Sequence, residues 1–286
     1  MSLLNAIILG IIQGVAEFLP VSSSGHLSIA QNLFGFTVEG TNDMFFDVLL
    51  HLGTLFAVFV AYWREIYEMI VEFFTLVSDL LRGKKQGKVS GTRRLIGMII
   101  VATLPLFVIL PIKDLVEDLS GNTYFIGGAL LVTGCLLLAC DRVRKGRKTE
   151  ETATMKDALI VGIGQAIATC PGISRSGMTI SVGCFRGFER SFAVRFAFLM
   201  SIPAVLGANI LSIADAVESG IDPSLLPTYF VGVVVAAVSG YLCIRLLKMI
   251  AEKGKFGAFA YYCWGMGVLT VILTILKGMG ALPWLN

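Results

Sequence analysis

Two polar stretches in an otherwise apolar chain hold the residues that could do chemistry. The first runs from Gln13 to His26 and reads QGVAEFLPVSSSGH, and the second runs from Cys170 to Thr179 and reads CPGISRSGMT. In each stretch a proline ends one helix and the Ser/Gly run behind it can begin another, because Ser is a favoured N-cap residue. The N-terminus of such a half-helix presents free N–H groups and a positive dipole, which predicts an anion site.

The side chains of both stretches suit a phosphate-like anion. Arg175 carries a planar guanidinium that matches phosphate geometry. The hydroxyl donors around it are Ser22, Ser23, Ser24, Ser174, Ser176 and Thr179. A charge at the centre of a membrane helix costs roughly 2.5–3.5 kcal/mol, so Glu17 and Arg175 predict a functional site. A purely structural ion pair between these two residues is the alternative.

His26, one of two histidines, lies three residues after Ser23, a spacing that can bring imidazole and hydroxyl together on a helix. Serine and histidine form a nucleophile–base pair in the general sense, and a structural histidine is the alternative. His51 follows Asp47 by four residues on one helical face, where we expect a supporting or substrate-entry role. The residues leave open a carboxylate, a sulfate or a phosphate as the anion, and the apolar surroundings favour a substrate that partitions into lipid.

The elements that must position these residues are membrane helices. Of 286 residues, 56% are hydrophobic and 15% are charged, whereas soluble domains carry about 25% charged residues. Six stretches have the roughly 17–25 residues that a membrane helix needs: 44–63, 95–112, 124–140, 192–214, 228–247 and 258–277, with kinks expected at Pro105 and Pro203. The sequence therefore predicts an all-α polytopic membrane protein with six transmembrane helices in one domain, 1–286.

Charges in the connecting loops predict the orientation. Lys and Arg gather in the loops 82–94, 141–151 and 248–255, and acidic residues prevail in the loops 113–122 and 215–223. Short basic loops stay cytoplasmic, which puts both termini outside. With the loops placed in this way, the six predicted spans account for every membrane crossing. The apolar stretches 3–36 and 157–185 must therefore enter and leave the membrane on the same side. Each is predicted to be re-entrant, one from each side of the membrane.

The two re-entrant stretches match each other when the chain is shifted by 152 positions. The informative identities are Gly10/Gly162, Gln13/Gln165, Ser22/Ser174, Ser24/Ser176 and Gly25/Gly177, because apolar matches are common in membrane segments. They predict an inverted-topology repeat, 1–112 and 157–286, whose site lies near the bilayer midplane where broken helices meet.

The stretch 64–81 differs from the six spans because it carries acidic residues on one helical face. These residues are Glu65, Glu68, Glu72 and Asp79. We therefore predict an interfacial amphipathic helix.

At these residues the sequence resembles the undecaprenyl-diphosphate phosphatase family of bacterial membranes, also known for bacitracin resistance. The first stretch is similar to the family's E/Q-x-x-x-E box and P-V-S-S-S/T-G-H run, and the second to its P-G-x-S-R-S-G-x-T box. The stretches 46–54 and 196–203 are similar as well, so the resemblance covers essentially the whole chain. It implies hydrolysis of undecaprenyl diphosphate to the monophosphate in the bacterial cytoplasmic membrane, at a site open to the outside. This reaction recycles the carrier lipid of cell-wall synthesis.

The resemblance also implies residue roles. In that family the serine matching Ser23 is the favoured nucleophile and the histidine matching His26 is its acid/base partner, with attack by the histidine as the minority view. Glu17 would act as a base or a metal ligand. The diphosphate would be held by Arg175, Ser174, Ser176 and Thr179, and we also expect substrate contacts from Gln13, Gln165, Ser22 and Ser24.

The family's activity is promoted by Mg²⁺ or Ca²⁺. Gln13 is the neutral option at the first position of its box, so we expect a metal bridged through the substrate's phosphates. The expected partners are a polyprenyl diphosphate lipid and membrane lipids, with no nucleic acid, and a homodimer is left open. The alternative function is a secondary transporter or lipid flippase, since inverted repeats with broken helices are typical of transporters. Ser23 with His26 favours the enzyme, because a carrier needs no nucleophile.

Overall fold

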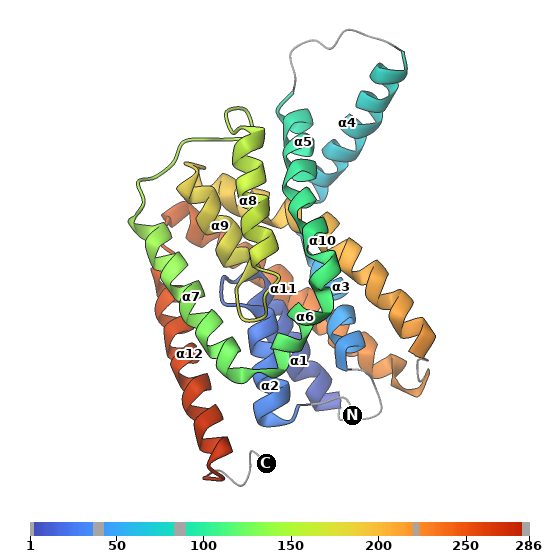
Figure 1. Ribbon diagram of the computed structural model, residues 1–286. Coiled ribbons are helices and arrows are strands. Elements are labelled where there is room, and N and C mark those ends of the chain that lie inside the picture. Colours follow the sequence, from blue (N-terminus) through green and yellow to red (C-terminus); the bar gives the residue numbers. More distant parts are fainter. Residues whose placement is uncertain (1–2, 37–42, 83–89, 220–222, 282–286) are drawn as a thin grey trace.

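The computed structural model describes residues 3–36, 43–82, 90–219 and 223–281, which are almost entirely helical (Figure 1). The α-helices are α1 (Leu3–Phe18), α2 (Ser23–Phe34), α3 (Asp43–Ala61), α4 (Trp63–Leu81), α5 (Gly91–Thr103), α6 (Lys113–Asp118), α7 (Thr123–Arg142), α8 (Met155–Ile167), α9 (Arg175–Phe185), α10 (Arg190–Ser219), α11 (Leu226–Lys253) and α12 (Gly257–Gly278). Short 3-10 helices span Leu104–Val108, Leu110–Ile112, Leu119–Gly121 and Pro223–Leu225.

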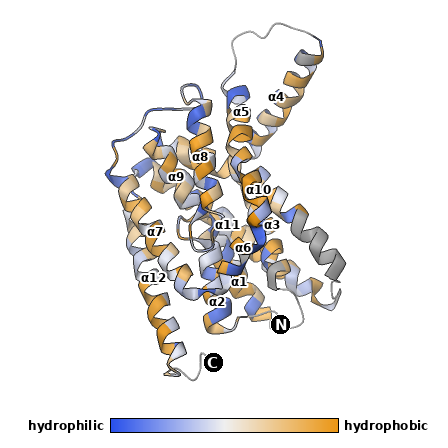
Figure 2. Ribbon diagram, viewed as in Figure 1, coloured by the Kyte–Doolittle hydropathy of each residue, from blue (hydrophilic) through white to orange (hydrophobic). Residues whose placement is uncertain are grey.

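Five helical stretches of the described chain are long and apolar enough to cross a membrane. They are Gly91–Val116, Thr123–Arg142, Arg190–Ile210, Leu226–Lys253 and Gly257–Gly278. Each coincides with one of the predicted spans, so the prediction of an all-α polytopic membrane protein is confirmed. Figure 2 shows predominantly hydrophobic residues along α7 and α12 and hydrophilic residues in the linker between α7 and α8. This distribution suits helices that face lipid and a linker that faces water.

The sixth predicted span, 44–63, corresponds to α3. Together α3 and α4 form a bent pair with an angle of 84° between their axes, and Tyr62 lies at the break between them. Arg93 of α5 holds α4 through Glu72 at 2.7 Å and Asp79 at 3.4 Å. The two helices thus run in different directions, and both the count of six spans and the interfacial position of α4 stay predictions.

The prolines act differently in the two spans that they interrupt. At Pro105 helix α5 gives way to 3-10 turns, since proline lacks the N–H that would continue the α-helical ladder. At Pro203, by contrast, α10 continues as one helix through the proline.

The two predicted re-entrant stretches are helical hairpins. The first consists of α1 and α2, joined by residues 19–22, and the second of α8 and α9, joined by residues 168–174. In Figure 1 the hairpins approach from opposite ends and their loops meet near the middle of the molecule. Helix α1 packs mainly on α11, and α8 packs on α5. The inverted repeat and its boundaries stay a prediction, for which two hairpins from opposite ends are the expected arrangement.

Small residues let the first hairpin pack closely on its neighbour. A Cβ atom on Gly14 would lie 2.5 Å from the carbonyl oxygen of Ala236, and one on Gly10 would lie 2.7 Å from that of Gly232. The equivalent glycine of the second hairpin, Gly162, would place a Cβ 2.3 Å from the carbonyl oxygen of Ala102 in α5. Glycines spaced by four residues therefore allow backbone contact between helices, a common way of packing helices in membranes.

A buried carboxylate fixes the second hairpin to the linker before it. Asp157 accepts hydrogen bonds from Lys148 Nζ and Arg186 Nε, both at 2.8 Å, and forms a capping box with Thr154 at the start of α8. Burial alone would raise the pKa of Asp157, but the hydrogen bonds from Lys148, Thr154 and Arg186 hold it well below its usual value. The charged form of Asp157 therefore stabilises this end of the fold.

We predict that Gly14→Ala destabilises the protein by about 1–3 kcal/mol, because the added methyl overpacks a backbone contact. Gly128→Ala is the matched control, since a Cβ at Gly128 of α7 would meet no atom within 4 Å. Thermal unfolding in detergent should show a clearly lower Tm for Gly14→Ala and an unchanged or higher Tm for Gly128→Ala. Equal effects of the two substitutions would contradict close packing of α1 on α11.

We predict that Asp157→Asn lowers Tm by a constant amount between pH 5 and pH 8. Because the pKa of Asp157 is lowered by folding, its stabilising effect is complete above the unfolded value of about 4 and is lost as the pH falls below it. The difference in Tm between wild type and variant should therefore become smaller only below about pH 4. Thermal unfolding across this pH range measures the difference in Tm. A difference that already becomes smaller near pH 6 would contradict the stabilising role of the charged Asp157 carboxylate.

Candidate active site

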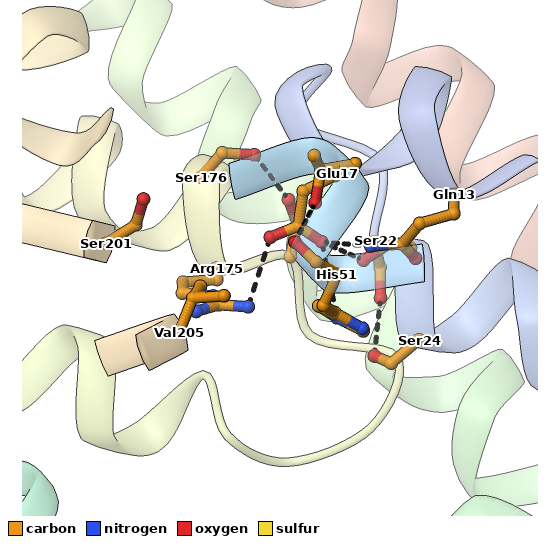
Figure 3. A network of polar contacts seen from close by, with 12 residues as sticks. Gln13, Glu17, Ser22, Ser24, His51, Arg175, Ser176, Ser201 and Val205 are labelled. Carbon is orange, nitrogen blue, oxygen red and sulfur yellow. Dashed lines mark hydrogen bonds and ion pairs between the residues drawn. The ribbon is translucent and has the colours of Figure 1, made fainter. Parts of the chain in front are cut away.

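Glu17, at the end of α1, is the centre of a polar cluster between the two hairpin loops (Figure 3). Its Oε2 accepts hydrogen bonds from Ser23 Oγ at 2.6 Å and from Gln13 Nε2 at 3.1 Å, and its Oε1 accepts one from Arg175 Nη2 at 3.1 Å. The carboxylate side chain is 10% exposed and that of Arg175 is 28% exposed. One buried carboxylate thus joins both hairpins through the Glu17–Arg175 ion pair, a contact that the functional and the purely structural interpretations share.

A second layer of residues supports this carboxylate from α3. His51 Nε2 lies 3.6 Å from Glu17 Oε2, and His51 Nδ1 lies 2.8 Å from the carbonyl oxygen of Asp47. The side-chain amide of Gln31 donates to both carboxylate oxygens of Asp47 at 3.1 Å. His51 therefore contacts the cluster in the supporting position that its place on α3 predicts.

Serine caps begin both half-helices. Ser22 precedes α2 and accepts from the N–H of Gly25 at 3.2 Å, and Ser174 precedes α9 and accepts from the N–H of Gly177 at 3.0 Å. Ser22 has a φ of 75°, a left-handed conformation that costs a non-glycine residue about 1–3 kcal/mol. The cap and the surrounding loop hold the residue in this conformation, which turns the chain sharply into α2 just before Ser23.

The two loops also hold each other. Ser24 Oγ accepts from the N–H of Gly172 at 3.3 Å, and Ser176 Oγ donates to the carbonyl of Leu19 at 3.3 Å. Ser24 and Ser176 are equivalent under the shift of 152 positions, and each bonds to the backbone of the opposite loop. A Cβ on Gly25 would lie 3.1 Å from the Cα of Gly172, which shows how closely the loops approach.

As a result, both half-helices contact the Glu17 carboxylate through their first residues, Ser23 of α2 and Arg175 of α9. These two residues also occupy equivalent positions under the shift of 152 residues. A hydroxyl bonded to a carboxylate is a nucleophile with an adjacent base. A guanidinium beside two helix N-termini can hold an anion in front of that hydroxyl. The cluster can therefore transfer an electrophilic group such as phosphoryl to Ser23.

The expected pairing of Ser23 with His26 is not what the structure contains. Ser23 Oγ donates to Glu17, while His26 Nδ1 lies 2.7 Å from the carbonyl oxygen of Ser22 and His26 Nε2 lies 2.8 Å from the hydroxyl of Tyr262. The reason is local: His26 follows Ser22 by four residues, so its ring bonds back onto the Ser22 carbonyl at the start of α2, which also accepts the backbone N–H of His26 at 3.2 Å. Glu17 is the base that directly contacts Ser23.

The other expected substrate contacts divide into two groups. Gln13 belongs to the cluster, whereas the hydroxyls of Ser22, Ser24, Ser174 and Ser176 cap helices and join loops, and Thr179 Oγ1 donates within α9 to the carbonyl of Arg175 at 2.8 Å. Gln165 is 1% exposed, and its amide has no hydrogen-bond partner in the described part of the chain. The position equivalent to Glu17 is Thr169, so Gln165 lacks the carboxylate that Gln13 has.

The donor set does not fit a metal ion held by the protein alone. Within the described residues no group of three or more His, Cys, Asp or Glu side chains could hold one. Glu17, the expected ligand, already accepts three hydrogen bonds from Ser23, Gln13 and Arg175. Any divalent cation here would need most of its oxygen ligands from the substrate and water.

Sequence reasoning missed three residues that support the site: Gln31, Thr133 and Tyr262. Thr133 of α7 accepts from the N–H of Ser174 at 3.1 Å and donates to the carbonyl of Gly172 at 3.4 Å, which fixes the second loop. None of the three belongs to the polar stretches. Only Thr133 carried a signal, as a hydroxyl within an apolar span.

Comparison with known proteins agrees over nearly the whole chain. A family model described as bacitracin resistance protein BacA matches residues 6–269. An undecaprenyl-diphosphatase of Alkaliphilus metalliredigens is 42% identical over 277 residues, which cover 96% of this chain and 100% of that protein. Undecaprenyl-diphosphatases of Methanosphaera stadtmanae and Desulforapulum autotrophicum are 39% and 42% identical, and the alignments cover 96% and 95% of this chain and 99% and 98% of those proteins.

We predict that Glu17 and Arg175 are energetically coupled. Glu17→Ala leaves the guanidinium without its partner and should cost about 3 kcal/mol, as should Arg175→Ala. The double variant should be more stable than the sum of the two losses by about 1–3 kcal/mol. Unfolding in denaturant measures the cycle, and the more exposed pair of Arg195 with Glu150 is the control, with weaker coupling expected. Additive losses at Glu17 and Arg175 would contradict the proposed central ion pair.

Proposed function

The chain belongs to the bacitracin resistance protein BacA family, and we infer that it is an undecaprenyl-diphosphatase. It hydrolyses undecaprenyl diphosphate to undecaprenyl phosphate and inorganic phosphate. The reaction returns the carrier lipid to cell-wall synthesis and confers resistance to bacitracin. The observation that carries this function is the 2.6 Å hydrogen bond from Ser23 to Glu17 beside Arg175, a nucleophile, a base and an anion-binding group in one cluster.

In the proposed first step Ser23 Oγ attacks the terminal phosphorus of the lipid diphosphate. The new O–P bond forms as the bond from that phosphorus to the bridging oxygen breaks, and the hydroxyl proton passes to Glu17. Undecaprenyl phosphate leaves with the bridging oxygen and a phosphoserine remains at position 23. Arg175 turns from Glu17 to the phosphoryl oxygens as the carboxylate takes up the proton, and stabilises their charge.

In the proposed second step water hydrolyses the phosphoserine. The water oxygen bonds to phosphorus as the bond to Ser23 Oγ breaks, and the proton on Glu17 returns to the serine. One proton of the water must leave, and His26 is the base proposed for it, because it lies three residues along the same half-helix. Serine attack with histidine assistance agrees with the roles that the family resemblance implies, and Glu17 is added as the direct base of Ser23.

The two half-helices suit the diphosphate group for an electrostatic reason. Both α2 and α9 begin at the cluster, so their positive ends point at the same place from opposite hairpins. We propose that Mg²⁺ or Ca²⁺ enters with the substrate and is bridged by its phosphates. When bound, such an ion neutralises phosphate charge; each residue role above is independent of it.

The protein is a multi-pass membrane protein. We propose that it lies in the bacterial cytoplasmic membrane with both termini outside. The basic linker between α7 and α8 supports this orientation, because it lies at the end of the molecule opposite to the start of α1 and the end of α12 (Figure 1). A transporter or flippase needs the anion site but not the hydroxyl–carboxylate pair, so the enzyme explains more of the cluster.

We predict that the detergent-purified protein releases phosphate from farnesyl or C55 diphosphate, and that Ser23→Ala and Glu17→Gln each reduce kcat by about 10³-fold. Arg175→Lys keeps the positive charge but loses the paired N–H donors of the guanidinium, so it should retain more activity than Arg175→Ala. Ser28→Ala, on the same helix but outside the cluster, is the control and should keep wild-type activity. No release by folded wild type, with or without Mg²⁺ or Ca²⁺, would reject the phosphatase.

A further inference from the structure

The hydrogen bonds of His26 define which of its ring nitrogens carries a proton. Nδ1 lies 2.7 Å from the backbone carbonyl oxygen of Ser22. A carbonyl oxygen can only accept, so Nδ1 must carry the hydrogen of this bond. In the neutral imidazole Nε2 then has a lone pair and no hydrogen, which makes it the proton acceptor of the ring.

That lone pair is already occupied by Tyr262 of α12. The Tyr262 hydroxyl lies 2.8 Å from His26 Nε2, and the two rings are nearly parallel, with an angle of 8° between their planes. Since Nε2 is the acceptor, Tyr262 is the donor. Nε2 has a single lone pair, so a proton that arrives from outside the pair can reach it only through the tyrosine oxygen.

We propose that Tyr262 is the outer member of a proton relay with His26, which rests on the proposed phosphatase function. As the attacking water loses a proton to the Tyr262 oxygen, the tyrosine proton passes to His26 Nε2, so that the tyrosine is unchanged and the imidazole becomes imidazolium. The reverse transfer restores the neutral ring after phosphate leaves. Tyr262 thus also fixes the orientation of His26, whose tautomer is set by the Ser22 carbonyl, and it belongs to neither polar stretch.

The position of Tyr262 suits this role. It is 45% exposed, whereas the serine at the centre of the cluster is 9% exposed, so the tyrosine lies nearer the surface of the protein than the serine. Its neighbour Tyr261 is 64% exposed and packs edge-on against Trp264 instead. The two adjacent tyrosines therefore differ in their contacts, and Tyr261 offers a matched control on the same helix.

Kinetics with Tyr262→Phe test the relay. We expect kcat for phosphate release to fall about tenfold with KM within about twofold, because the loss of one proton-transfer group slows the chemical step more than binding. Tyr261→Phe should keep wild-type kcat. In a His26→Ala background, Tyr262→Phe should cause no further loss, since the relay is already broken. An unchanged kcat in Tyr262→Phe, or an equal loss in both backgrounds, would overturn the proposal.

A spectroscopic measurement separates the failure of this proposal from the failure of the phosphatase. The chain has two histidines, so ¹⁵N-histidine labelling gives two imidazoles, and His26→Ala identifies the signals of His26. The relay requires the Nδ1–H tautomer in wild type and a shifted Nε2 signal in Tyr262→Phe, with no change in Tyr261→Phe. An Nε2–H tautomer in wild type would overturn the relay. The expected spectra in a protein that releases no phosphate would leave the His26–Tyr262 bond standing and reject the enzyme.

Discussion

The structure depends on a buried negative charge at Glu17 and on the donors that must surround it. A carboxylate in an apolar interior is stable only when several hydrogen bonds and opposite charges compensate its lost hydration. Here the compensating groups come from α1, α2, α3 and α9. All four helices must therefore be in place before the charge is satisfied, which couples the assembly of both hairpins to the formation of the site.

The helices supply these donors because their backbones pack very close together. Glycines on α1 and α8 allow contact with carbonyl groups of α11 and α5, and Gly25 lies against Gly172 where the loops touch. Close packing of this kind moves the two half-helix N-termini to one place without a long connecting side chain. The proposed phosphate site is thus made largely of backbone dipoles, and Arg175 adds the single formal positive charge that the second loop supplies.

Much of this organisation follows from sequence patterns. Apolar runs predict the spans, loop charges predict the re-entrant stretches, and the matched Gly, Ser and Gln positions predict that the two loops meet. The pairing of Glu17 with Arg175 could be named beforehand because unpaired charges are costly in a membrane. The hydrogen-bond partner of Ser23 could not be predicted, because helical spacing shows which residues share a face but not where a hydroxyl points. Tyr262 lies 236 residues after His26 in the chain, and no local pattern links them. Gln165 shows the limit of matched positions, since it is identical to Gln13 but has Thr169 where Gln13 has the carboxylate of Glu17.

The equivalence of Ser23 and Arg175 has an evolutionary consequence. Two separate copies of a half-length ancestor would carry the same residue at both positions, either two serines or two arginines. Such an assembly would have two nucleophiles without a cation, or two cations without a nucleophile. The present division of labour therefore requires two halves whose sequences differ at this pair of positions. The asymmetry at this pair, together with that between Glu17 and Thr169, distinguishes this phosphatase from a symmetrical carrier built on the same plan.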